Sequence, residues 1–198
     1  MKKRKTPWKF ILLFLLIFTG FILLIGFRFT ADSALPNDTK IIESIPTVYG
    51  KAILYEDTNN HTFGLAEIHR SGGFMYHYAG GTYDYYIEGN EPFKAAGFGS
   101  DVEDGFMVGI RIKDPNIKHI VIGNHLENLT PSDEYEFNIE TVKKHPTRYH
   151  IKEVVNQHVL FVLDEYSEFT WTIRALDQDG NLISDKLFGM SEARYVDW

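Results

Sequence analysis

The apolar positions of this chain follow two patterns, one near the N-terminus and another over the remainder. Residues 10–27 form an uninterrupted run without a charged side chain. As a helix, such a run would extend about 27 Å, close to the roughly 30 Å of a bilayer's hydrocarbon core. Basic side chains precede it at Lys2, Lys3, Arg4, Lys5 and Lys9. Because cytoplasmic flanks carry the excess of Lys and Arg, the pattern predicts a single-pass signal-anchor. Residues 1–9 would be a cytoplasmic tail, and the chain after residue 27 would be extracytoplasmic.

A cleaved signal peptide is the alternative interpretation of this segment. Ala31 and Ser33 could provide the small residues that a cleavage site needs before Ala34. The apolar run is longer than the roughly 7–15 residues typical of a signal core. We therefore favour a retained anchor and leave cleavage open.

Beyond a linker over residues 28–46, apolar and polar residues alternate with a period of two. From residue 106 to 112, large apolar side chains alternate with Met107, Gly109 and Arg111, which predicts a strand with one face in water. The same alternation predicts a strand from Phe169 to Ala175.

Turn residues divide this alternating part into short strands. We expect hairpins at Ser71-Gly72-Gly73, at Gly80-Gly81 and at Asp177-Gln178-Asp179-Gly180. Within this part, residues 126–144 are the stretch where a helix is allowed, and residues 40–45 could be a short helix or a strand. The fold class is therefore mainly β, an antiparallel sandwich or meander with at most one or two short helices, preceded by the transmembrane helix. The β-rich domain would cover residues 47–198, either as one unit or as two smaller ones, 47–100 and 101–198.

The charge of the chain is distributed unevenly. Six of the 20 basic residues lie at or before Arg28, and all 27 acidic residues lie after it. The expected exported part therefore has 14 basic and 27 acidic residues, a formal charge of −13. This field excludes general binding to nucleic acid. The chain contains no cysteine, which excludes disulfides, thiolate metal sites and lipoprotein processing and is typical of a Gram-positive surface protein.

A cluster of tyrosines is the best candidate for a ligand-binding surface. If Gly80-Gly81 formed a hairpin, Tyr76 and Tyr78 on one strand would face Tyr83 and Tyr85 on the other. Exposed tyrosine rings stack on sugars or on a partner protein. The alternative is that these rings fill the core of an ordinary sheet.

Histidines and carboxylates supply the remaining candidate chemistry. His69 and His77 could face each other across the Ser71-Gly72-Gly73 turn, and His119, His125, Glu127 and Asp133 are the other groups that a hydrolase could use. No motif with metal-ligand spacing is present, and the glycine at position 180 comes too early for a calcium loop. We therefore predict no metal, no cofactor and no identifiable catalytic residue.

Three segments carry a resemblance to known proteins: Ala52 to Tyr55 with Phe63 to Ala66, Gly109 to Lys118, and Phe169 to Asn181. In this order behind an N-terminal anchor, they resemble uncharacterised membrane-anchored exported proteins of Bacillus-like bacteria. The resemblance implies a location at the cell membrane and a β fold. It implies no chemistry.

These observations favour a non-enzymatic binding or accessory module of the bacterial envelope. The expected partners are the membrane, through residues 10–27, and a cell-wall polymer or an envelope protein. The alternative is a surface hydrolase using carboxylate and histidine side chains. A third interpretation is a sensor or accessory subunit whose transmembrane helix makes the contact, although Gly20 and Gly26 are too far apart for a Gly-x-x-x-Gly motif.

Overall fold

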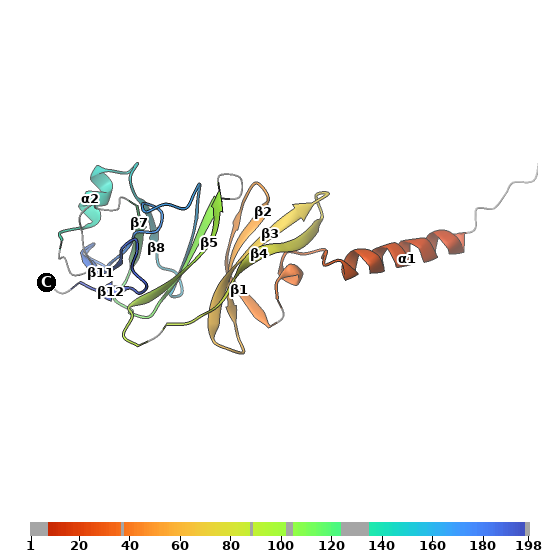
Figure 1. Cartoon of the computed structure of the whole chain (residues 1–198), viewed down its shortest axis with the longest axis horizontal. Coiled ribbons are helices and arrows are strands. Elements are labelled where there is room, and N and C mark those ends of the chain that lie inside the picture. Colours follow the sequence, from red (N-terminus) through yellow and green to blue (C-terminus); the bar gives the residue numbers. More distant parts are fainter. Residues whose placement is uncertain (1–7, 37, 88, 102–104, 124–134, 197–198) are drawn as a thin grey trace, which may run out of the picture.

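The structure, a computed structural model, consists of a helix that leads away from a body of three antiparallel β-sheets (Figure 1). It describes residues 8–36, 38–87, 89–101, 105–123 and 135–196. The prediction of a mainly β, antiparallel fold is confirmed.

The first sheet is a meander in which each strand pairs with the next. Its strands are β1 (Thr39–Pro46), β2 (Gly50–Asp57), β3 (Thr62–Ser71) and β4 (Met75–Tyr85). The turn at Ser71-Gly72-Gly73 joins β3 to β4 as predicted, with Gly72 and Gly73 both at positive φ.

The central sheet and the C-terminal sheet contain the other strands. In the central sheet, β6 (Gly105–Ile112) lies between β5 (Phe93–Asp101) and β9 (His158–Leu163). The C-terminal sheet has the order β12, β11, β10, β7, β8. Its elements are β7 (His119–Ile122), β8 (His150–Glu153), β10 (Ile173–Leu176), β11 (Leu182–Lys186) and β12 (Arg194–Tyr195), with α2 (Ile139–Lys144) packed beside them. The two-unit division that we considered at residues 100 and 101 falls at the β5–β6 hairpin, inside the central sheet.

Both faces of the central sheet are buried, and this corrects the expectation of a strand with one wet face. Phe106 and Val108 of β6 pack against the C-terminal sheet. Met107 packs against the first sheet, and a Cβ on Gly109 would lie 2.6 Å from a methyl group of Leu65. Met107 and Gly109 therefore face a second core instead of water, because the first sheet covers them.

Gly80 and Gly81 do not form a turn, so the predicted hairpin between two tyrosine rows is wrong. Both glycines lie in the middle of β4, which pairs with β3 over its whole length except at two bulges. A Cβ on Gly80 would lie 2.6 Å from the Phe98 ring, and one on Gly81 would lie 2.0 Å from the Leu65 carbonyl oxygen. Within this strand, the two glycines leave room for neighbouring groups that approach closely, and they do not form a turn.

The strand predicted from Phe169 to Ala175 begins only at Ile173. Ser167 and Thr170 hydrogen-bond each other's main chain, and the Trp171 amide donates to the Ser167 carbonyl at 2.9 Å. Such local hydrogen bonds compete with strand pairing. They form a turn from which Trp171 projects. The turn at Asp177 to Gly180 does connect two paired strands, as predicted.

An arginine is completely buried beneath the C-terminal sheet. Arg174 donates from Nη1 to the Gly123 carbonyl at 2.7 Å and from Nε to the Tyr135 hydroxyl at 3.0 Å. Its guanidinium group lies 4.7 Å from the centroid of the Phe137 ring. Carbonyl, hydroxyl and ring contacts are therefore among the interactions that stabilise this buried charge.

Helix α1 (Trp8–Leu24) precedes the sheets, and none of its described side chains is buried. Within the described ranges, no helix has both the length and the apolar character that crossing a membrane requires. The segment after α1 pairs with β4 of the first sheet. Arg28 and Tyr76 exchange two main-chain hydrogen bonds of 2.7 Å. Part of the expected linker is structured, as the 3-10 helix η1 (Asp32–Ala34) and β1.

Candidate functional site

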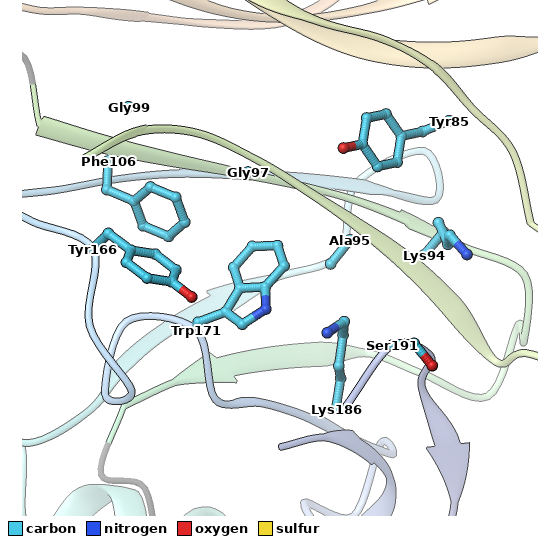
Figure 2. Close-up of a pocket in the computed structure, with 10 residues that line it drawn as sticks. All are labelled: Tyr85, Lys94, Ala95, Gly97, Gly99, Phe106, Tyr166, Trp171, Lys186 and Ser191. Atoms are coloured by element: carbon cyan, nitrogen blue, oxygen red, sulfur yellow. The ribbon is translucent and has the colours of Figure 1, made fainter. Parts of the chain in front are cut away.

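A cavity of about 580 Å³ lies beside β5, one of the two edge strands of the central sheet. Segments far apart in the sequence form its walls, including the end of β4, the loop between β9 and β10, and the end of β11. The lining residues are Tyr85, Lys94, Ala95, Gly97, Gly99, Phe106, Tyr166, Trp171, Lys186 and Ser191. Figure 2 shows the rings of Phe106, Tyr166 and Trp171 gathered at one end and Lys94, Lys186 and Ser191 at the other. A volume of this size lies within the range of small-molecule sites.

The aromatic end of the cavity depends on a glycine in β5. Phe106 packs edge-on against Tyr166 and Trp171, with ring centroids 5.0 and 5.6 Å apart. A Cβ on Gly97 would lie 2.8 Å from Trp171 and 2.9 Å from Phe106. Any larger residue at this position would displace these rings, because they pack directly against the backbone of Gly97.

Lys186 brings a buried cation into the cavity. The residue is only 5% exposed, and its ammonium group donates to the Met190 carbonyl and lies 4.9 Å from the centroid of the Trp171 ring. Over the described ranges, no carboxylate lies within ion-pair distance of this ammonium. Burial, together with the charge of Lys94, lowers the pKa of Lys186 to about 8. The lysine therefore carries its charge at neutral pH without an anionic partner in contact among the residues that the structure describes.

Lys94 is the second cation of the cavity, and it has a partner. Its ammonium group lies 3.0 Å from Oε1 of Glu91, whose side chain is only 4% exposed. Oε2 of the same carboxylate is buried and has no hydrogen-bond partner among the described residues. Two lysines and one glutamate leave a net positive charge at this end of the cavity, although the chain after Arg28 as a whole is strongly acidic.

The four tyrosines proposed from the sequence lie on two faces of the first sheet. Tyr76 packs on the outer face, beside the residues that follow α1, and Tyr85 packs on the inner face and lines the cavity. Tyr78 and Tyr83 are 39% and 71% exposed. The bulge between Tyr78 and Gly80 changes which side chains face outward, so the four rings do not form one surface.

His69 and His77 are directly opposite each other on β3 and β4, as the sequence suggested. Their ring centroids are 5.5 Å apart, and Nε2 of His69 contacts the carboxylate of Glu67. Phe27 lies 4.9 Å from His77 and Tyr49 lies 5.1 Å from His69, again between centroids. The two imidazoles are thus enclosed in a row of rings that joins the segment after α1 to the first sheet.

The other candidate groups do not join this pair in the part of the chain that we can describe. His119 begins β7 in the C-terminal sheet, far along the topology from β3 and β4. His125, Glu127 and Asp133 lie outside the described residues. In the described ranges, no three His, Asp or Glu side chains are placed to hold a metal ion.

Sequence reasoning missed most of the cavity. Trp171 was assigned to a strand, and Lys94 and Lys186 were not singled out, because no local pattern connects residues from β5, β11 and a turn. One available signal was the spacing of Ala95, Gly97 and Gly99, which places only small groups on one face of a strand. Small residues in this arrangement often mark the close approach of a ring or a ligand.

The geometry must therefore carry the functional argument by itself. A search of family models, of curated proteins and of solved structures found no match to this chain.

Proposed function

We propose that this protein is a non-enzymatic binding module, tethered to the cell membrane by its N-terminal segment, that receives its ligand in the cavity beside β5. The observation that supports the proposal best is one cavity that combines aromatic rings with a buried lysine, whose ammonium pairs with no carboxylate among the described residues. Rings of this kind stack on flat or cyclic ligands, and a few polar groups then fix the orientation.

The membrane tether rests on α1 and on its flanks. The uncharged run of residues 10–27 follows a basic N-terminus, and the described side chains of α1 are not covered by the β body. The apolar side chains need another environment, and a bilayer would supply it. We expect the full-length protein to stay with membranes after alkaline extraction, and Leu15→Arg with Ile17→Arg to release it. Release of the unaltered protein would contradict the tether.

The binding proposal is tested by retention of the full-length protein, in detergent micelles, on immobilised cell-wall polymer. Trp171→Ala should abolish retention, whereas Phe169→Ala, which changes an exposed ring outside the cavity lining, should not. Loss in a variant with Tyr78→Ser and Tyr83→Ser instead would move the site to β4. Absence of retention in the unaltered protein would contradict a wall-polymer ligand. Scrambling residues 10–27 without changing their composition should leave retention intact, since α1 serves only as the tether.

A surface hydrolase is the alternative function, and one observation favours it. Glu67, His69 and His77 form a contiguous carboxylate and imidazole cluster. This function predicts that the full-length protein releases new reducing ends or amino groups from wall polymer. Glu67→Gln should then abolish the release, and the exposed Glu140→Gln should not.

A further inference from the structure

We infer that the cavity beside β5 is specific for an acidic saccharide, a sugar ring that carries a carboxylate or phosphate group and stacks on Trp171 while its anion pairs with Lys186. This inference rests on the proposed binding function and adds the class of ligand. It is carried by the positions of a ring and a cation that lie within one cavity.

The first argument is the charge of Lys186. A buried ammonium group is expensive unless an anion and hydrogen bonds compensate it. Lys186 has one carbonyl contact and a ring contact, and Glu91, the described carboxylate whose charge acts on it, pairs with Lys94. Methionine or leucine would fill the same space without this cost. An anionic ligand would provide the missing partner and explain why a lysine is present.

The second argument concerns the shape of the site. The indole of Trp171 and the phenol of Tyr166 lie at one end, Lys94 lies at the other, and the ammonium group of Lys186 is 4.9 Å from the Trp171 ring centroid (Figure 2). A sugar ring has apolar C–H faces that suit stacking on aromatic rings, and its hydroxyls could reach Ser191. A bare inorganic anion would use the lysines and leave the aromatic end empty. A neutral sugar would use the rings and leave Lys186 unpaired.

The acidity of the surrounding protein adds selectivity. The exported part carries a formal charge of −13, so it repels anions in general and admits them only where the local charge is positive. The site with Lys94, Lys186 and Glu91 has such a local charge. Specific pairing in the cavity must therefore overcome the repulsion, and binding should strengthen as salt screens it, up to the concentration at which the contact with Lys186 is itself screened.

The test is calorimetric titration of the full-length protein, in detergent micelles, with matched probes. One pair is a galacturonic acid tetramer and its methyl ester, which has the same rings without the charges. A second pair is glucose 6-phosphate and inorganic phosphate, which has the anion without the ring. We expect the acid to bind about tenfold or more tightly than its ester, or the sugar phosphate to exceed inorganic phosphate by the same factor. The pair that shows the difference identifies whether the ligand carries a carboxylate or a phosphate.

Variants separate the two parts of the inference. Lys186→Met should weaken binding of the charged probe about tenfold and leave the ester unaffected. Lys144→Met, which changes an exposed lysine of α2, should alter neither. Equal binding of acid and ester, together with equal binding of the sugar phosphate and inorganic phosphate, would overturn the inference and leave the proposed binding function standing. If no probe bound, the inference would fail, while retention on wall polymer would still decide the proposed function. A thermal melt of each variant shows that it is folded.

Discussion

The ammonium group of Lys186 lies 4.9 Å from the centre of the Trp171 ring, and the two residues come from different sides of a cavity. Lys186 ends strand β11, whereas Trp171 leaves a turn held by Ser167 and Thr170. A cation over an indole ring gains some stabilisation, roughly 1–2 kcal/mol when water is excluded, which is less than the cost of burying an unpaired charge. An anion bound beside Lys186 would therefore compensate a charge that the indole ring compensates only in part.

Lys186→Met is expected to stabilise the protein at neutral pH. Burial lowers the pKa of Lys186 from 10.5 to about 8 in the folded state. Between these values the unfolded chain binds the proton and the folded protein does not, so the free energy of unfolding rises with pH across this window. Below about pH 8 the penalty is complete. Denaturant titrations should thus show the variant more stable by on the order of 1–3 kcal/mol at pH 7, with the difference shrinking towards pH 10.5. A difference that did not change with pH would contradict the burial of this charge.

Gly97→Ala should distort the aromatic end of the cavity. The added methyl group would meet Trp171 and Phe106 at less than 3 Å, and overpacking of this kind costs about 1–3 kcal/mol. Trp171→Leu removes one of the two clashes. In a double-mutant cycle measured by urea unfolding, the two costs should therefore sum to more than the cost of the double variant. Strict additivity would show that Gly97 and Trp171 do not contact each other.

Arg174→Met is expected to be severely destabilising, by about 3–5 kcal/mol, because it leaves the Gly123 carbonyl and the Tyr135 hydroxyl without their buried donor. Arg148→Met, at an exposed position, is the control and should lie within about 0.5 kcal/mol of the unaltered protein. Chemical denaturation measures both. A loss below 1 kcal/mol for Arg174→Met would mean that water replaces the guanidinium group.

His158 should make the protein less stable in mild acid. Burial lowers the pKa of His158 below its ordinary 6.5, and Nδ1 donates to the Asn156 carbonyl at 2.8 Å. As the pH falls through about 6.5, the unfolded chain takes up the proton first, so the free energy of unfolding decreases and continues to do so down to the folded pKa. Unfolding of His158→Gln should show a smaller decrease between pH 7.5 and 5. The exposed His150→Gln should retain the full decrease.

Tyr83→Ser and Tyr85→Ser should differ in stability although both change the same residue type on the same strand. Tyr83 is 71% exposed, so its loss should cost less than about 0.5 kcal/mol. Tyr85 packs against Phe63 with centroids 5.8 Å apart, between the first and central sheets, and its loss should cost about 1–3 kcal/mol. Thermal melts of the two variants compare them directly. Equal losses would contradict the separation of these rings onto different faces.

The sequence was sufficient for the class of fold but not for its layers. Alternation and turn residues correctly indicated short antiparallel strands, because these signals depend on neighbours in the chain. Whether Met107 and Gly109 face water or a second sheet depends on β2 and β3, which are distant in sequence. For the same reason, the sequence predicts a turn at Gly80-Gly81, whereas in the structure the Phe98 ring leaves no room for a side chain at Gly80.

The candidate site was harder to predict than the fold. Each of its charged and aromatic residues has an ordinary local explanation, as strand, turn or surface residue. Only the packing of β5 against the turn before β10 and the end of β11 brings Lys94, Trp171 and Lys186 together. Such non-local assembly leaves no spacing to recognise.

The burial of β6 on both faces also determines which errors in the gene the fold can tolerate. Deleting one residue within Gly105–Ile112 would exchange its two faces, turning Phe106 and Val108 towards the first sheet and Met107 towards the C-terminal sheet. The loss of a single codon would then place side chains of the wrong size in both cores. A deletion in the exposed turn at Ser71-Gly72-Gly73 would shorten one hairpin and leave both cores intact. A screen of single-codon deletions should accordingly find its sharpest intolerance at β6, in the middle of the molecule.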